Sequence, residues 1–212
     1  MPIREALPGD AAALAAVHVL SWRAAYRELL PGPYLEGLDV EERAATWHAR
    51  LTAPDRPTVL LATDGERGVG SGEGAAGDGE RGVGGGERGV GGGEEAAGDG
   101  KRRVGGGRPV AFACFRPWPG EGFDPAPTAE LAALYALPEV WGTGIGRALL
   151  SVTTGALVTA GFRSAALWVF AGNGRARRFY EAAGWRADGG AAREETGGWI
   201  LEELRYRRDL SR

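Results

Sequence analysis

A glycine-rich turn is the stretch of this sequence best suited to chemistry. Within residues 134–150 an apolar strand stops at Pro138, and Gly142, Gly144 and Gly146 then lead into a helical pattern. The backbone N–H groups of such a turn, together with the dipole of the helix that follows, form a binding site for anions. Because glycine has no Cβ, the backbone can approach a pyrophosphate closely. The turn therefore predicts a site for a phosphorylated ligand.

Two common nucleotide-binding motifs do not fit this turn. In the dinucleotide fingerprint Gly-x-Gly-x-x-Gly, the last position falls on Arg147 when the count begins at Gly142 and on Leu149 when it begins at Gly144. The Walker A motif requires Gly-Lys-Ser/Thr, and the turn contains no lysine. These failures argue against a nucleotide-dependent oxidoreductase and against a P-loop enzyme.

A second stretch, residues 167–185, adds a different pattern. An apolar strand leads to Asn173, a helix follows with Tyr180 seven residues later, and Gly184 and Trp185 end it. Together with the glycine turn, this stretch resembles the GNAT superfamily of N-acetyltransferases. The turn is similar to that family's pyrophosphate loop, Gln/Arg-x-x-Gly-x-Gly/Ala, except that Trp141 stands at the Gln/Arg position. The resemblance spans residues 3–64 and 109–208.

The resemblance implies an enzyme that transfers acetyl from acetyl-CoA to a primary amine of a small molecule or peptide, by direct attack in a ternary complex. Two alternatives stay open: acetylation of protein N-termini, and a non-catalytic module that binds acyl-CoA for regulation. In both acetyltransferase hypotheses, acetyl-CoA is a co-substrate. Its pantetheine arm is expected to insert where two parallel strands separate, and its pyrophosphate to lie on the glycine turn. The residues that would bind it are Leu134, Tyr135, Ala136, Leu137, Trp141, Gly142, Thr143, Gly144, Ile145, Gly146, Arg147, Asn173 and Tyr180.

Catalytic roles follow from the same resemblance. Tyr180 would be the general acid that protonates the leaving thiolate, although it could instead be a core tyrosine on an apolar helix face. Glu130 would be the general base, or else an exposed carboxylate at a strand end. A backbone N–H near Ala136 or Leu137 would polarise the thioester carbonyl. Asn173 suits both a contact to pantetheine and the N-cap of its helix.

The acceptor pocket is expected from the first helices. His18, Trp22 and Tyr26 are spaced four residues apart, so they share one helix face. They form either a partly buried aromatic seam or a floor for the acceptor, where a ring would meet an ammonium by a cation–π contact.

The elements around these residues predict an α/β (α+β) fold with a single mixed sheet, splayed at its centre and flanked by helices. Strands are expected at 3–6, 58–63, 109–115, 130–137, 164–170 and 200–206, the last paired with residues around 185–188. Helices are expected from Asp10, as N-cap, to about Tyr26, and over 40–51, 144–160 and 173–183. The unit from 130 to 170 should be a right-handed crossover between parallel strands.

A low-complexity tract interrupts this single domain. Residues 65–108 contain 20 of the 37 glycines, and the hexad Gly-Glu-Arg-Gly-Val-Gly begins at Gly65, Gly79 and Gly86. The tract contains no aromatic residue, leucine or isoleucine, and it therefore has too little apolar surface to offset the chain entropy that would be lost on ordering. We expect it to be a disordered insertion in a hairpin. Strand-like runs flank it on both sides, and closing a longer loop costs little.

Composition narrows the remaining classes. A net charge of −3 gives no general attraction for nucleic acid, and no run of residues is apolar and long enough for a membrane span. The single cysteine, Cys114, lies in an apolar run, which favours a buried inert thiol. Two histidines without a Cys/His cluster make a metal site unexpected. We expect a cytoplasmic protein, with no nucleic-acid or membrane partner, in which the closing strand could pair across a homodimer.

Overall fold

One mixed sheet forms the centre of the molecule. The computed structural model describes residues 1–65, 107–120 and 127–211. Within them the sheet has the order β1-β2-β3-β4-β5-β7-β6. Its strands are β1 (Ile3–Glu5), β2 (Thr58–Thr63), β3 (Pro109–Pro117), β4 (Thr128–Ala136), β5 (Ser164–Phe170), β6 (Arg186–Thr196) and β7 (Trp199–Asp209). The tract predicted as an insertion, 65–108, lies outside the described residues except at its ends.

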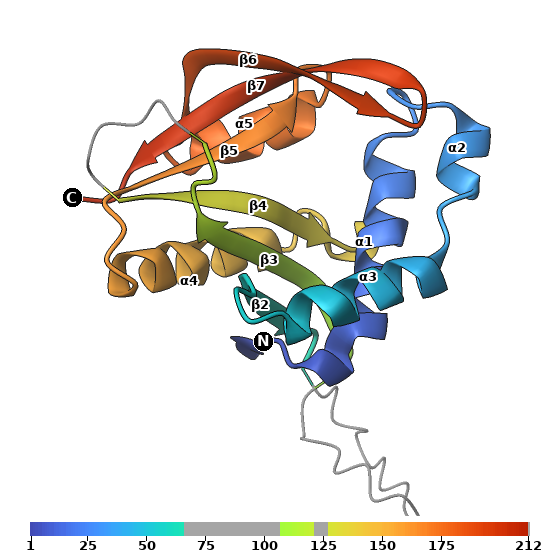
Figure 1. Cartoon of the computed structure of the whole chain (residues 1–212), viewed down its shortest axis with the longest axis horizontal. Helices are drawn as coiled ribbons and strands as arrows, with labels where there is room; N and C mark the ends of the chain where they lie inside the picture. The colour runs from blue at the N-terminus through green and yellow to red at the C-terminus, as the bar shows by residue number, and fades with distance from the viewer. Residues whose placement is uncertain (66–106, 121–126, 212) are drawn as a thin grey trace, which may run out of the picture.

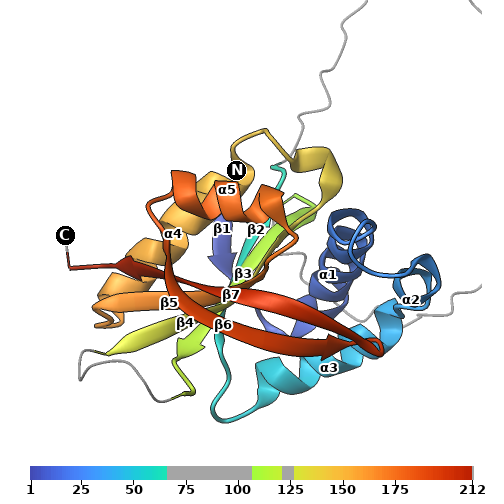
Figure 2. The ribbon, with the colours of Figure 1, turned by 90° about the horizontal axis from the view of Figure 1, so that it is seen from above.

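Helices cover both faces of the sheet (Figures 1 and 2). On one face α1 (Ala11–Ala25) and α3 (Val40–Thr52) enclose a core with Phe112 and Trp47. On the other, α4 (Ile145–Thr159) and α5 (Gly174–Ala182) enclose a core with Leu149 and Trp185. The predicted α/β fold with helices on a single mixed sheet is confirmed. Among the described residues, no helix has the length and apolar character that crossing a membrane requires.

The two central strands are parallel only at one end. Thr128, Ala129 and Glu130 of β4 pair with Ser164, Ala165 and Ala166 of β5, and the pairing then stops. A hydrogen bond of 2.6 Å between the buried hydroxyls of Thr128 and Ser164 holds the closed end. Beyond Glu130 the strands diverge, because β4 stays with β3 whereas β5 stays with β7. This is the splayed centre that the resemblance predicted.

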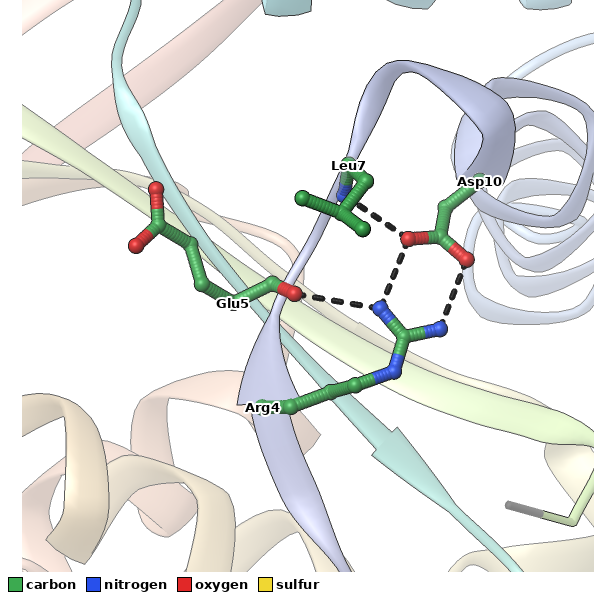
Figure 3. A network of polar contacts seen from close by, with 4 residues as sticks. All are labelled: Arg4, Glu5, Leu7 and Asp10. Atoms are coloured by element: carbon green, nitrogen blue, oxygen red, sulfur yellow. Dashed lines mark hydrogen bonds and ion pairs between the residues drawn. The ribbon is translucent and has the colours of Figure 1, made fainter. Parts of the chain in front are cut away.

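The start of the chain is fastened by an ion pair. Arg4 donates from Nη1 and Nη2 to the two carboxylate oxygens of Asp10, each at 2.7 Å, and the Leu7 N–H donates to Asp10 Oδ2 at 2.8 Å (Figure 3). The hydrogen bond from Arg4 is the main cause that lowers the pKa of Asp10. The sequence predicts Asp10 as the N-cap of this helix, and Asp10 does precede α1 directly. Its carboxylate, however, binds Arg4 and Leu7 and makes no capping hydrogen bond to α1, so this part of the prediction is wrong.

One short helix was not predicted. Residues Gly32–Glu36 form α2, a single turn that follows Pro31. Arg23 of α1 holds the end of this turn by donating to the carbonyl oxygens of Leu35, Glu36 and Leu38 at 2.9–3.0 Å. A helix of this length has almost no periodicity to detect, and its stability comes from that tertiary contact.

The hairpin of β6 and β7 reaches across to α2 (Figures 1 and 2). At its tip Gly197 adopts a φ of +61°, and a Cβ on this residue would lie 2.3 Å from the ring of Tyr34. Only glycine permits both the positive φ and so close an approach. The hairpin and the first helices thereby enclose the same side of the sheet.

Candidate active site

A cleft of about 870 Å³ opens where β4 and β5 separate. Its walls are β4 and the end of β5, the beginning of α4, one side of α5, the later part of α1, and residues of the β6–β7 hairpin. Most of the residues that the sequence proposed for the site line this cleft: Trp22, Tyr26, Glu130, Leu134, Tyr135, Ala136, Trp141, Gly142, Thr143, Gly144, Gly146, Arg147, Asn173 and Tyr180.

The glycine turn has the geometry of an anion site. Gly142 and Gly144 adopt φ values of +80° and +92°, a conformation that other residues rarely adopt. The first hydrogen bond of α4 joins the Ala148 N–H to the Gly144 carbonyl. The N–H groups of Ile145, Gly146 and Arg147 consequently have no acceptor within the helix. The side chain of Ile145 packs into both cores, so this residue faces the turn through its backbone alone.

The edge of β4 is open to the cleft. The Leu137 N–H donates to Val110 of β3 at 2.9 Å. Since successive peptide groups of a strand point to opposite edges, the N–H groups of Leu134 and Ala136 point toward the gap. Leu137 is itself buried and lies outside the cleft. Of the two N–H donors proposed for the thioester carbonyl, Ala136 is therefore the one that faces the cleft.

Tyr180 of α5 lines the cleft. Only 8% of its surface is exposed, and its hydroxyl makes no hydrogen bond to another described residue. Burial, with a smaller contribution from Tyr135, raises the pKa of Tyr180 well above its ordinary value. The phenol is therefore protonated at neutral pH, and its O–H is available to a ligand.

Asn173 caps α5 as predicted. Its side-chain oxygen accepts from the Ala176 N–H at 3.0 Å. The same side chain lines the cleft, where its amide also hydrogen-bonds the Tyr26 hydroxyl. The N-cap is confirmed, and a contact to pantetheine stays a prediction.

The predicted aromatic face of α1 divides into two parts. The rings of Trp22 and Tyr26 line the cleft, with centroids 5.0 Å apart. His18 instead lies behind the cleft, where its ring stacks on Tyr135 at 4.7 Å and its Nδ1 accepts from Trp47 Nε1 at 3.4 Å. Burial lowers the pKa of His18 to about 3, with smaller contributions from nearby arginines, so the ring is neutral. His18 belongs to the aromatic seam, one of the two alternatives predicted for it.

Three carboxylates line the cleft. Glu130 lies there, and its Oε2 accepts from Arg116 Nε at 2.6 Å. Glu194 and Glu203 lie there as well. Desolvation, followed by the charges of Glu194 and Glu130, raises the pKa of Glu203. The first turns of α4 and α5 add two arginines to the lining, Arg147 and Arg175.

Four charged residues of the cleft were missed by the sequence: Arg116, Arg175, Glu194 and Glu203. Alternation along the last strand puts Glu203 and Arg205 on one face, but the sequence does not say which face meets the cleft. Arg175 was detectable, because it lies two residues after the capping Asn173.

Two other kinds of site, a reactive thiol and a metal centre, find no support in the described part of the chain. Cys114 is buried, and burial raises the pKa of its thiol to about 11, which leaves it a poor nucleophile, as predicted. Within residues 1–65, 107–120 and 127–211, no three His, Cys, Asp or Glu side chains are arranged to hold a metal ion.

Comparison with known proteins agrees with this geometry. Residues 99–185 match the acetyltransferase (GNAT) family. The chain is 30% identical over 173 residues to YuaI, an uncharacterised N-acetyltransferase of Bacillus subtilis (strain 168), a match that covers 81% of this chain and 72% of YuaI. The chain belongs to the GNAT family. It is therefore an acetyl-CoA-dependent N-acetyltransferase by enzyme class, as the two sequence motifs predicted.

Solved GNAT structures share the fold. A GCN5-related N-acetyltransferase from Rhodopseudomonas palustris superposes with a TM-score of 0.61 at 18% identity, covering 98% of this chain and 94% of that one. The PaiA N-acetyltransferase of Thermoplasma acidophilum, solved in complex with coenzyme A, superposes with a TM-score of 0.55 at 17% identity, covering 98% of each chain. At such identities the similarity concerns the fold.

Proposed function

We propose that the cleft holds acetyl-CoA and a primary amine of a small molecule or a peptide together, and that the amine attacks the thioester directly. The observation that carries this proposal is that one continuous cleft is lined by a glycine turn with two arginines nearby, by a buried phenol and by three carboxylates. A phosphorylated coenzyme suits the glycine turn, and an ammonium suits the carboxylates and the aromatic rings.

Acetyl-CoA supplies an activated acetyl group when it is bound. The turn at Gly142 and Gly144 has the free N–H groups and the close backbone approach that a pyrophosphate needs. The free edge of β4, at Leu134 and Ala136, can bond an extended pantetheine arm as a neighbouring strand would. In this arrangement the Ala136 N–H serves the thioester carbonyl.

Tyr180 would give a proton to the departing thiolate. An ordinary phenol has a pKa of about 10 and a thiol one of about 8.5, so full transfer already runs slightly uphill. Burial raises the pKa of Tyr180 further. The phenol therefore acts best as a hydrogen-bond donor whose proton moves as negative charge builds on sulfur.

The part of the cleft that is lined by Trp22, Tyr26 and the carboxylates would receive the amine. Trp22 and Tyr26 offer ring faces to an ammonium, and Glu130 is placed to accept its proton directly or through water. Glu203 is a second carboxylate in the same space, and its raised pKa brings it closer to the pH at which the reaction runs. On β5 the cleft is lined by Trp168, whose side chain cannot act as a base.

The test is a screen for thiol release. Purified protein, acetyl-CoA and a panel of amines, amino acids and peptides should give coenzyme A release above hydrolysis with at least one acceptor, and the product should carry one added acetyl group by mass spectrometry. The Tyr180→Phe variant is the matched control. Binding of acetyl-CoA by calorimetry without transfer to any of these acceptors would overturn the proposal.

A further inference from the structure

The turn that should hold the phosphates begins with a tryptophan that has no donor left. The Trp141 indole N–H donates to the Ala136 carbonyl oxygen at 2.8 Å. Because an indole has only this one polar hydrogen, Trp141 cannot also donate to a phosphate. A side-chain contact to a phosphate must therefore come from another residue beside the turn, either from Arg147 on α4 or from a neighbouring element.

Arg175 stands at that place. It is the second residue of α5, and its guanidinium carbon lies 3.7 Å from the centre of the Trp141 ring. At this distance a planar guanidinium stacks on the indole face. Both side chains line the cleft, beside the turn that contains Gly142 and Gly144.

The charge of Arg175 is uncompensated within the described residues. None of their ion pairs involves it, and none of their hydrogen bonds involves its guanidinium. Desolvation lowers the pKa of Arg175, and no carboxylate counters that effect. On the same helix Arg177 differs, because it donates to Tyr206 and to the Ala171 carbonyl. A stacked arginine with all five N–H donors unused is prepared for a phosphate.

We propose that Arg175, held on the face of Trp141, binds a phosphate group of the coenzyme and supplies the side-chain contact that Trp141 cannot make. Trp141 is then a positioning residue: its indole N–H fixes the ring to β4, and the ring fixes the guanidinium. This inference rests on the proposed function, since it assumes that the cleft holds acetyl-CoA.

The experiment measures coenzyme A affinity by calorimetry at low ionic strength. Arg175→Met keeps apolar contact with the indole but removes the donors, and it should weaken binding about tenfold or more, the scale for losing hydrogen bonds from a charged group. Arg175→Lys should recover part of that loss, because an ammonium still attracts phosphate as a point charge. Arg178→Met, on the same helix but outside the cleft, is the matched control and should change affinity less than twofold.

Two phosphate sources are separated by a second ligand. Dephospho-coenzyme A lacks the 3′-phosphate, and we expect Arg175→Met to weaken its binding as much as that of coenzyme A, which assigns the contact to the diphosphate beside the turn. A loss seen with coenzyme A but absent with dephospho-coenzyme A would assign it to the 3′-phosphate and would equally support the proposal.

The positioning role is tested by a double-mutant cycle. Trp141→Phe keeps a ring and removes the bond to Ala136, and Trp141→Ala removes both, so Trp141→Ala should weaken binding severalfold in the presence of Arg175. In the Arg175→Met background the same change should have little further effect. Independent, multiplying losses would overturn the positioning role. If the wild type binds coenzyme A and Arg175→Met binds it with an affinity within twofold of the wild type, the inference about Arg175 is overturned and the proposed function still stands. If the wild type does not bind coenzyme A, the proposed function is rejected as well.

Discussion

The coenzyme end and the acceptor end that we propose for the cleft are built in different ways. The proposed coenzyme end consists largely of two short stretches, 141–147 and 173–180, and much of what it offers is backbone N–H groups at helix beginnings. The proposed acceptor end is assembled from single side chains of α1, β4, β5, β6 and β7. A backbone site made of contiguous residues is visible as a motif, whereas a site made of scattered side chains depends on how the sheet closes. The sequence therefore predicts the first end more directly than the second.

Tyr180→Phe tests the proposed general acid, which acts between the coenzyme and the acceptor, and should have the largest effect. The ring keeps its packing and only the hydroxyl is lost, so coenzyme affinity should stay within about twofold. Turnover at saturating acetyl-CoA should fall by roughly a hundredfold or more, the usual scale for a positioned acid. A single-turnover measurement should accompany it, because slow product release can mask a chemical defect. Turnover within about threefold of the wild type would show that Tyr180 is a core residue.

Gly144→Asp tests the coenzyme end. The substitution puts a negative charge where the N–H groups of α4 meet an anion, and acetyl-CoA affinity should fall by more than about tenfold. The residue has a φ of +92°, so strain must be separated from charge. Gly144→Asn has nearly the same shape, tolerates a positive φ better than most residues and carries no charge. If calorimetry gives equal acetyl-CoA affinities for the two variants, the proposal that the pyrophosphate binds at this turn is rejected.

Glu203→Gln tests the acceptor end, with a smaller effect. Because folding raises the pKa of Glu203, the ionised carboxylate destabilises the fold above that pKa, and the cost disappears below the usual glutamate pKa of about 4.3. The variant should melt a few degrees higher than the wild type near pH 8, and the gap should close as the pH falls toward 4. In kinetics, the KM for a cationic acceptor should rise several-fold while coenzyme affinity stays unchanged. A change of coenzyme affinity instead would mean that the two ends are not independent.

Deletion of residues 66–106 should have the smallest effect. The β2–β3 hairpin already closes at the Asp64 N–H, which donates to the Arg108 carbonyl at 3.0 Å. A Cβ on Gly107 would lie 2.7 Å from the carbonyl carbon of Gly65, so the two ends of the tract nearly touch. The shortened chain should melt within a few degrees of the wild type and bind acetyl-CoA equally well. A large fall in melting temperature would show that the tract packs on the domain.

How far the sequence predicted this molecule follows the same division. Helices and strands with clear periodicity, the parallel β4–β5 unit and the Asn173 cap were predicted because each depends on local spacing. Asp10 was assigned the wrong contact because its partner, Arg4, comes from a different element. His18 and Trp22 share a helix face, yet only the fold shows that one faces a core and the other the cleft. Glu203 was invisible for a similar reason, since its strand has two faces.

The ion pairs of Arg108 connect the hairpin end to the coenzyme loop. Arg108 Nη2 lies 2.9 Å from Glu139 Oε1, two residues before Trp141, and Arg108 Nε lies 3.6 Å from Asp64 Oδ2. A fluorescent label placed at the junction of 65 and 107 would thus sit beside the loop without occupying the cleft. If the deletion of 66–106 is tolerated as predicted, a change in the emission of this label on addition of acetyl-CoA would report coenzyme binding in real time.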